Sequence, residues 1–381
     1  MKVISDLHLD QHTAYARMDS DSRYPGCNSR AVEILKAVEA VYANAALKDM
    51  RHVVIPGDVF HRRGIVLVPL LNALCEIFHR YADSGIKTIL LPGNHDYVDK
   101  HAKYEADHLH ALYGMAGGNV IVVSEPQIFR LFEGGGKLTC GFIPYTPSRE
   151  LWIKRAQSLA AMAGKIAGDP APFVLFAHQS FNGAATGPHE FIMPEGISLL
   201  DIPEEVTRVI SGHYHLFQNL NEKLTYVGGI VQHNFGERMY TPGHLEIDLK
   251  RPNIAAVHLE NEKSPRFAIY EGNDETAVID TLVSASDSGD YTQIRWTGKS
   301  SAVREIREAM KGDFLSSVVE VPSEPESAPR LILGGLETTP EIIEKYMNYV
   351  LSRTPMPSSL PSALLKEGIR IFEATHRGGS I

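Results

Sequence analysis

Short apolar stretches that each end in polar, ligand-type side chains recur five times along the chain, and this recurrence constrains the fold most. The stretches are residues 3–4, 53–56, 88–91, 173–176 and 209–210. Patterns with helical spacing at 29–50 and 69–84 separate the first three, which is typical of buried strands in a layered α/β fold. Chemistry in such folds lies at the strand ends, so we expect one composite site.

The polar residues that follow these stretches are oxygen and imidazole donors. They are Asp6, His8, Asp58, Asn94, His95, Asp96, His178, His213 and His215. No thiolate is among them, which favours Mn²⁺, Mg²⁺, Fe or Zn over softer metals. Seven candidate ligands are more than one tetrahedral site needs. They suit two metal ions that share one carboxylate, which is the arrangement used by enzymes that hydrolyse phosphoesters. Glycines at 57, 93 and 212 are expected to let the backbone turn sharply before the donors.

Each of these motifs is weak when taken alone. The Asp6-x-His8 pair can be a polar strand end, Gly57-Asp58 is usually a turn, and a single His178 is more often a hydrogen-bonded histidine than a ligand. The Gly-Asn-His-Asp run at 93–96 and Gly-His-x-His at 212–215 are more specific. Their common place at strand ends makes a joint site the stronger interpretation.

The composition bounds the class of protein. A length of 381 residues predicts two or three domains at about 150 residues each. A hydrophobic fraction of 44% with 22% charged residues excludes a disordered chain. The net charge of −9 requires any DNA contact to rest on a local patch, bound cations or a partner. The three cysteines form no C-x-x-C pair, which suits a reducing cytoplasm, and no apolar run is long enough for a membrane span.

The organisation along the chain predicts three parts. Residues 1–259 are expected to form one domain, in which strand-like stretches between 119 and 259 build a second sheet over the first. A polar linker at 260–266 leads to a βαβ pattern at 291–321, in a domain that ends at 335. The last part, 336–381, contains amphipathic helices at about 340–353 and 362–374.

The order D-x-H, G-D, G-N-H-D, H, G-H-x-H resembles the calcineurin-like metallophosphoesterase superfamily. Within it, residues 5–9, 57–61 and 226–237 are similar to the SbcD-type nuclease subunit, kin to the meiotic-recombination repair nuclease. The pattern at 291–321 resembles the DNA-capping domain of these nucleases. The resemblance implies an α/β fold, namely a four-layer αββα double β-sandwich with a small C-terminal α+β capping domain.

The resemblance also implies roles for the donor residues. One metal ion would be bound by Asp6, His8, Asp58 and His215, and the other by Asp58, Asn94, His178 and His213. His95 would stabilise charge on the scissile phosphate or protonate the leaving oxygen, and Asp96 would orient the His95 ring. A water molecule shared by the two ions would be the nucleophile.

Three residues after Asp58 are candidates for substrate binding. His61 stands where many members of the superfamily have Asp, and it would steer the DNA strand unless it is simply an exposed loop residue. Arg62 and Arg63 would bind phosphate or belong to a solvated turn.

The function implied is that of a two-metal DNA nuclease with Mn²⁺, or Mg²⁺, acting in DNA repair, recombination or replication. Its partners would be DNA, an SbcC-like ABC-type ATPase bound by the C-terminal helices, and a second copy of the chain, in the cytoplasm of a bacterial or phage-infected cell. One alternative is a phosphatase or phosphodiesterase on a small or protein substrate, which Arg62, four residues after Asp58, favours. A metal-free scaffold is the other alternative; it predicts missing ligands, and none is missing.

Overall fold

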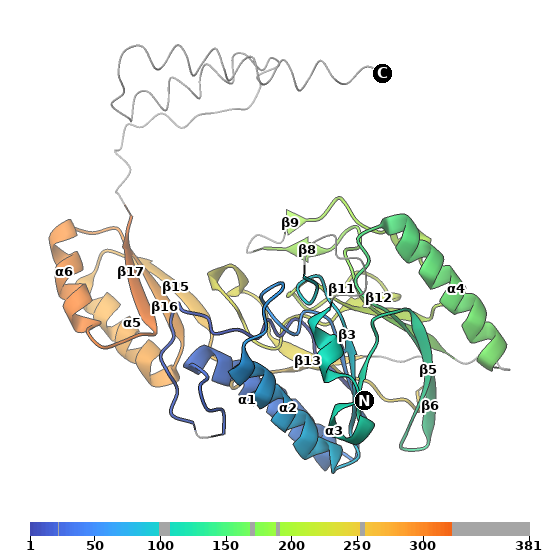
Figure 1. Cartoon of the computed structure of the whole chain (residues 1–381). Helices are drawn as coiled ribbons and strands as arrows, with labels where there is room; N and C mark the ends of the chain where they lie inside the picture. The colour runs from blue at the N-terminus through green and yellow to red at the C-terminus, as the bar shows by residue number, and fades with distance from the viewer. Residues whose placement is uncertain (22, 99–106, 168–171, 188–190, 252–255, 322–381) are drawn as a thin grey trace, which may run out of the picture. The chain divides into compact units, whose positions relative to one another are not determined.

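The structure is a computed structural model of the chain, and it describes residues 1–21, 23–98, 107–167, 172–187, 191–251 and 256–321 (Figure 1). The helices expected at 340–353 and 362–374 and the boundary expected after residue 335 lie outside the described residues. In the described part of the chain, no helix combines the length and the apolarity that a membrane crossing requires.

The first of two large sheets has six strands in the order β14-β13-β1-β2-β3-β4. The strands are β1 (Lys2–Val3), β2 (His52–Pro56), β3 (Lys87–Leu91), β4 (Val120–Val122), β13 (Gly243–Glu246) and β14 (Val257–Glu260). Strands β1 to β4 are parallel to one another, whereas β13 runs antiparallel to β1 and β14. Because β1, β2 and β3 are parallel, the segments that follow them leave the sheet at the same edge.

The second sheet also has six strands, in the order β11-β12-β10-β7-β6-β5. They are β5 (Gln127–Glu133), β6 (Gly136–Ile143), β7 (Phe173–His178), β10 (Arg208–Gly212), β11 (Gln218–Asn219) and β12 (Leu224–Tyr226). Strands β7 and β10 are parallel neighbours in register, with Gly212 opposite His178. The second sheet expected from the sequence is therefore confirmed, with the ends of β7 and β10 side by side. A separate hairpin joins β8 (Ala185–Thr186) to β9 (Phe191–Ile192).

Three hydrophobic clusters stack the helices and sheets into four layers. One cluster lies between the first sheet and the helices α1 (Ser29–Leu47) and α2 (Val68–Ala82), a second between the two sheets, and a third between the second sheet and α4 (Arg149–Ala167) (Figure 1). The remaining short elements are η1 (His108–Leu112), α3 (Met115–Gly118), η2 (Leu199–Asp201) and η3 (Phe235–Glu237). The layers match the double sandwich that the resemblance implies.

Alternating side chains of the strands fill these layers. In β2, Val53 and Ile55 face α1 and α2, while Val54 between them faces the second sheet. In β7, Val174 and Phe176 point into the space between the sheets, and Leu175 points towards α4. Both faces of these strands are covered, which explains why their sequences are continuous apolar runs.

The chain from residue 267 forms a smaller parallel sheet with its own core. Its elements are β15 (Phe267–Gly272), α5 (Glu275–Ser288), β16 (Tyr291–Trp296), α6 (Ser300–Ala309) and β17 (Ser316–Glu320). We name these elements the C-terminal α/β unit. Its core is built on Val278, Leu282, Ile294, Trp296, Val303 and Ile306. The sequence pattern predicts β16, α6 and β17, which the structure confirms; the domain boundaries at 259 and 335 stay predictions.

Three of the longer elements are not predicted from the sequence. Helix α4 lies inside the segment 119–259, which the pattern describes as dominated by strands. Strand β15 and helix α5 precede the predicted βαβ pattern. The local signals for α5 are present, because Asp274 caps its first turn and Gly289 ends it in a left-handed conformation.

Substituting Phe176 tests the packing between the two sheets. Phe176 is fully buried and stacks on Phe142 with ring centroids 5.1 Å apart. Phe176→Ala is expected to lower the free energy of unfolding by about 3–5 kcal/mol, because it leaves a cavity in a rigid layer. Urea denaturation followed by circular dichroism measures the change. Phe132→Ala is the control, since that ring is 60% exposed on β5 and its loss should change stability little; equal losses in both variants would contradict the packing described.

Candidate active site

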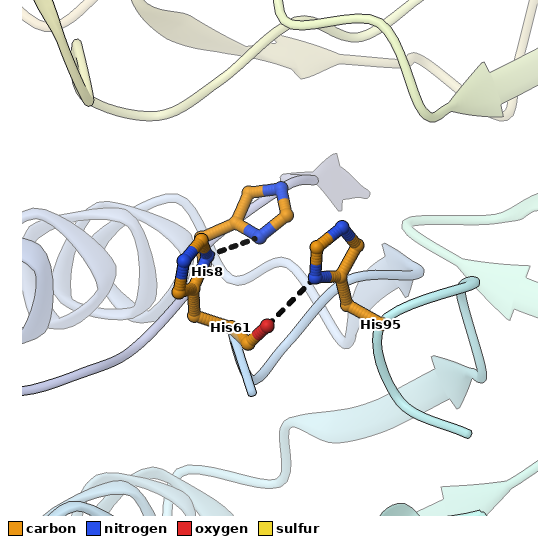
Figure 2. Close-up of side chains that lie close together, drawn as sticks. All are labelled: His8, His61 and His95. Atoms are coloured by element: carbon orange, nitrogen blue, oxygen red, sulfur yellow. Dashed lines mark hydrogen bonds between the residues drawn. The ribbon is translucent and has the colours of Figure 1, made fainter. Parts of the chain in front are cut away.

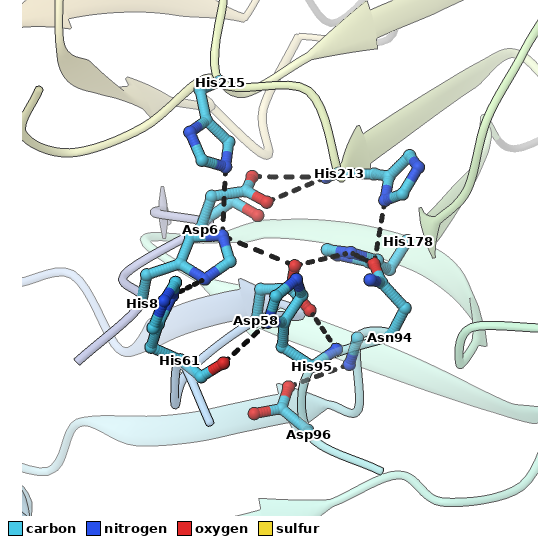
Figure 3. Close-up of polar contacts among 12 residues, drawn as sticks. Asp6, His8, Asp58, His61, Asn94, His95, Asp96, His178, His213 and His215 are labelled. Atoms are coloured by element: carbon cyan, nitrogen blue, oxygen red, sulfur yellow. Dashed lines mark hydrogen bonds and ion pairs between the residues drawn. The ribbon is translucent and has the colours of Figure 1, made fainter. Parts of the chain in front are cut away.

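The donors at the ends of five strands converge at one place (Figure 3). The ends of β1, β2 and β3 lie at one edge of the first sheet, and the ends of β7 and β10 lie at an edge of the second. A hydrogen bond joins the two sheets there, because His178 Nδ1 donates to the Pro56 carbonyl oxygen at 2.8 Å. The composite site expected from the sequence is therefore present in the structure.

Asp6, His8 and His215 form the first ligand group, in which each residue offers one ligand atom and all these atoms lie within 4.8 Å of one another. The Nε2 atoms of His8 and His215 are 3.0 Å apart. The Glu237 carboxylate accepts the His215 Nδ1–H at 2.8 Å, so the lone pair of Nε2 faces the group.

Asp58, His178 and His213 form the second ligand group, with the same spacing of ligand atoms. Asn94 lies against it, since its Oδ1 atom is 3.0 Å from His178 Nε2 and 2.9 Å from His213 Nδ1. The hydrogen bond from His178 Nδ1 to Pro56 leaves His178 Nε2 free to act as a ligand. All seven predicted metal ligands thus lie in or beside the two groups.

The carboxylate of Asp58 stands between the two groups. Its Oδ2 atom is 3.5 Å from His8 Nε2 and 3.4 Å from His178 Nε2. Its Oδ1 atom accepts the backbone N–H of His95 at 2.8 Å, which fixes the plane of the carboxylate. A single oxygen of the buried Asp58 carboxylate therefore lies close to one ligand atom of each group.

The donor set fits two divalent ions. Neighbouring ligand atoms around an octahedral ion with bonds of about 2.1 Å lie roughly 3 Å apart, and the His8–His215 and Asn94–His213 distances are of that size. Carboxylate, amide and imidazole ligands together suit Mn²⁺, Mg²⁺, Fe and Zn.

Opposite charges set the protonation of the metal-free groups. Burial opposes the ionisation of Asp58, but the His178 and His8 rings outweigh it and hold the pKa of the Asp58 carboxyl well below its usual range. Burial also opposes the protonation of His178 and of His215, yet Asp58 raises the pKa of His178 to about 9, and Glu237 raises the pKa of His215 to about 9. Ions that bind must displace these protons, so metal affinity rises with pH.

Four of the donors occupy strained backbone conformations. The φ angles are 53° at Asp6, 43° at His8, 53° at Asp58 and 100° at His213. Side chains with a Cβ rarely adopt positive φ, and such residues persist where the surrounding structure over-determines them, often at functional sites. These four strained residues are therefore all candidate metal ligands.

The glycines before the donors act in two different ways. Gly57 has a φ of 96°, as the expected sharp turn requires. Gly93 and Gly212 do not have positive φ; a Cβ on either would lie 2.3 Å or less from an atom of another residue. Close packing of the strand ends, rather than a turn, requires these two glycines.

His95 and His61 lie beside the first group (Figure 2). His95 Nδ1 donates to the His61 carbonyl oxygen at 2.6 Å, and because a carbonyl only accepts, Nε2 is the atom left for substrate. The His61 ring places its Nδ1 3.3 Å from His8 Nδ1. Together, His8, His61 and His95 form a third cluster of donors with the spacing of a metal site.

Asp96 does not contact the His95 ring as expected. Its carboxylate accepts three backbone N–H groups instead, from Gly93 at 2.9 Å, Phe60 at 3.0 Å and Val59 at 3.2 Å. Burial, together with the nearby Asp58, raises the pKa of Asp96 to about 7. Asp96 thus ties the loop after β2 to the loop after β3, and the His61 carbonyl takes the predicted orienting role.

The two arginines after His61 are engaged elsewhere. Arg62 Nε donates to Asp10 at 2.9 Å, and Arg63 Nε donates to the Asn94 carbonyl oxygen at 2.9 Å. Neither lines the hollow over the ligand groups.

A hollow of about 220 Å³ opens over the two groups. It is lined by His8, His12, Asp58, His61, Asn94, His95, His213, His215, His233 and Asn234. His12, His233 and Glu237 are site residues that the sequence reading did not assign. The stretch 226–237 carries a family resemblance, but nothing in its spacing tells which of its residues contact the ligands.

A layered sandwich of this kind, with two groups of donors at its strand ends, defines a metallohydrolase. The chain belongs to the calcineurin-like phosphoesterases, whose family model matches residues 1–217. Membership of this family implies a metal-dependent hydrolase of phosphoester bonds that uses two divalent metal ions.

One curated relative, named "Putative phosphoesterase 244L", is from Invertebrate iridescent virus 6. It is 26% identical over 195 residues, which make up 48% of this chain and 59% of the viral protein, so the match spans less than two thirds of that relative.

Two solved structures are more distant. A dimetal phosphatase from Danio rerio is 10% identical with a TM-score of 0.38, and the match covers 68% of this chain and 98% of that one. The nuclease MPE from Pseudomonas putida is 15% identical with a TM-score of 0.26, covering 67% and 86%. Neither likeness is strong enough to bear on the substrate.

Replacing Gly93 tests how closely the strand ends pack. A Cβ there would lie 2.3 Å from both the backbone nitrogen and Oδ1 of Asp58, so Gly93→Ala must displace that carboxylate. We expect loss of bound metal, measured by mass spectrometry after dialysis, and a fall of about 10²-fold or more in hydrolysis of a phosphodiester dye. Gly164→Ala on α4 is the matched control, because its Cβ would meet nothing within 4 Å. Full metal content in Gly93→Ala would contradict the packing argument.

Proposed function

We propose that the protein is a two-metal DNA nuclease of the SbcD type, which hydrolyses phosphodiester bonds as the nuclease subunit of an SbcCD-like complex. The observation that carries the phosphodiesterase chemistry is the position of Asp58 Oδ2, within 3.5 Å of a ligand atom of each group. Such a carboxylate can bridge two ions. The ions, when bound, neutralise the phosphate and lower the pKa of a shared water molecule.

His95 is the residue best placed to act on the leaving oxygen. Its Nδ1 proton is committed to the His61 carbonyl, so Nε2 carries a proton only when the ring is charged. A charged ring at the hollow can stabilise negative charge on phosphate and then donate the Nε2 proton. His61 orients His95 through its backbone and contributes its own ring to the same wall.

Two features favour DNA over a small phosphate ester. The C-terminal α/β unit follows the matched family region and adds surface beside the loop after His8, where Tyr15 Oη is 2.6 Å from Ser317 Oγ. Arg62, the residue that favoured a phosphatase, is bound to Asp10 and does not line the hollow. The alternative of a small-substrate phosphatase therefore loses its main support.

Mn²⁺ is the proposed metal, with Mg²⁺ as the alternative. The ligands combine several imidazoles with carboxylates, and imidazole suits Mn²⁺ better than it suits Mg²⁺, which prefers oxygen and water. Two bound ions would add four positive charges to a chain whose net charge is −9, at the place where phosphate must arrive.

The proposed partners are DNA, an SbcC-like ATPase and a second copy of the chain. Durable binding of duplex DNA by an acidic chain requires additional surface, which dimerisation or the ATPase would supply. Residues 336–381 are the proposed tether to the ATPase. A pull-down titration of the ATPase with chains that end at 335 tests the tether, and unchanged affinity would place it elsewhere.

Substituting His95 separates chemistry from metal binding. His95→Ala should retain both ions and lose about 10²–10⁴-fold in rate, as expected for a general acid or charge-stabilising group. Asp58→Ala should lose both ions, because a bridging carboxylate serves each of them. Metal content and single-turnover rates measure the two effects. Near-wild-type turnover in His95→Ala would reject its role, and two tightly held ions in Asp58→Ala would reject the bridge.

The substrate is tested by comparison in one assay. With Mn²⁺, the protein should degrade linear duplex and single-stranded DNA and act weakly on small phosphate monoesters. Asp58→Ala, assayed in parallel, excludes a contaminating nuclease. Efficient hydrolysis of monoesters with no cleavage of either DNA would overturn the nuclease proposal in favour of a phosphatase.

A further inference from the structure

Residues 232–237, which we name the bridging segment, lie between the first ligand group and the C-terminal α/β unit. His233 donates from Nε2 to the Asp6 carbonyl oxygen at 3.0 Å. The Glu237 carboxylate accepts the His215 Nδ1–H at 2.8 Å and the His233 backbone N–H at 2.9 Å. The segment therefore holds two of the three members of the first group, Asp6 and His215.

The other side of the bridging segment is attached to β15. The Phe267 backbone N–H donates to Gln232 Oε1 at 2.8 Å. The Phe235 ring packs edge-to-face on the Phe267 ring, with centroids 4.9 Å apart. Phe267 is buried by these contacts. The same six residues thus contact the metal ligands on one side and the C-terminal α/β unit on the other.

Arg30, at the start of α1, ties this arrangement together. Its side chain is only 3% exposed, and its Nη2 donates to the His233 carbonyl oxygen at 3.1 Å. The guanidinium carbon lies 4.6 Å from the centroid of the Tyr291 ring and 5.0 Å from that of Phe267. Its nearest carboxylate, on Glu33, is 3.8 Å away, and its Nε has no hydrogen-bond partner among the described residues.

The burial of this charge depends on the C-terminal α/β unit. A buried guanidinium without a hydrogen-bonded carboxylate is costly to desolvate, and the faces of two aromatic rings compensate through cation–π attraction. Both rings, Phe267 and Tyr291, belong to the C-terminal α/β unit. If that unit shifts, Arg30 loses the cation–π contacts that offset the cost of burying its charge. The His233 carbonyl oxygen then loses a hydrogen-bond donor that is held in a fixed position.

We propose that Arg30 is a positioning residue through which the C-terminal α/β unit sets the metal affinity of the first ligand group, Asp6, His8 and His215. The second group is less dependent on it, because no hydrogen bond in the described residues joins the bridging segment to Asp58, His178 or His213. The inference rests on the two-metal part of the proposed function and not on DNA as the substrate.

Mn²⁺ titration of the metal-free full chain by calorimetry tests the proposal. Two backgrounds isolate the groups: His178→Ala retains the first, and His215→Ala retains the second. Arg30→Met keeps the length of the side chain but removes its charge and its donor. In the His178→Ala background, Arg30→Met should raise the Mn²⁺ Kd about 10–100-fold, which is the usual effect of losing a residue that supports metal ligands. In the His215→Ala background, Arg30→Met should leave the Mn²⁺ Kd unchanged.

Three further variants distinguish positioning from general destabilisation. Tyr291→Phe keeps the ring over Arg30 and removes only the hydroxyl's 2.6 Å bond to Glu33, so the Mn²⁺ affinity should not change. Arg30→Lys should recover part of the affinity, because it restores the charge and a donor. Phe267→Leu keeps apolar packing without the aromatic face, and should weaken only the first group.

Several outcomes would overturn the proposal. They are an unchanged Kd of the first group in Arg30→Met, equal weakening in both backgrounds, or the same loss in Tyr291→Phe. If circular dichroism shows that Arg30→Met does not fold, the Phe267→Leu titration decides in its place. Absence of DNA cleavage in a chain that shows the selective loss would refute the nuclease and leave this inference standing.

Discussion

The hydrogen bond from His178 Nδ1 to the Pro56 carbonyl is the interaction on which the site depends, because it joins the two sheets where their parallel strands end. Each sheet alone supplies an incomplete set of ligands: Asp6, His8, Asp58 and Asn94 follow strands of the first, and His178, His213 and His215 follow strands of the second. The close approach leaves no space for a Cβ at Gly57, which would lie 2.0 Å from His178 Nδ1. At this edge the two sheets therefore meet through the His178 imidazole and the Pro56 backbone carbonyl.

This arrangement concentrates strain and buried charge in a small volume. Four candidate ligands have positive φ, and several imidazoles and carboxylates are buried close together. Strain of this kind costs of order 1–3 kcal/mol for each residue and must be offset by the packed layers on either side. Metal ions relieve the crowding of imidazoles, so binding should add to the stability of the folded state.

The sequence identifies the residues that lie together at this site, because residue type and position at strand ends are local properties. Asp6, Asp58 and His178 follow apolar runs that can be recognised without knowing the fold. Supporting contacts are different, since they depend on how loops pack. No feature of the neighbouring sequence distinguishes Glu237 from the other acidic residues. Only the folded structure shows that its carboxylate accepts a hydrogen bond from His215, 22 positions away. Asp96 likewise has an imidazole next to it in sequence, yet three backbone amides surround it once the loops close.

The position of β1 in its sheet has a consequence for synthesis on the ribosome. This strand, at residues 2–3, lies between β2 and β13, and its antiparallel partner β13 spans residues 243–246. One edge of β1 therefore stays unpaired until the chain has been translated as far as β13, at about 5–20 residues per second. A nascent chain that pauses before β13 would expose an open strand edge next to Asp6 and His8, so the first sheet is completed only after β13 has been made.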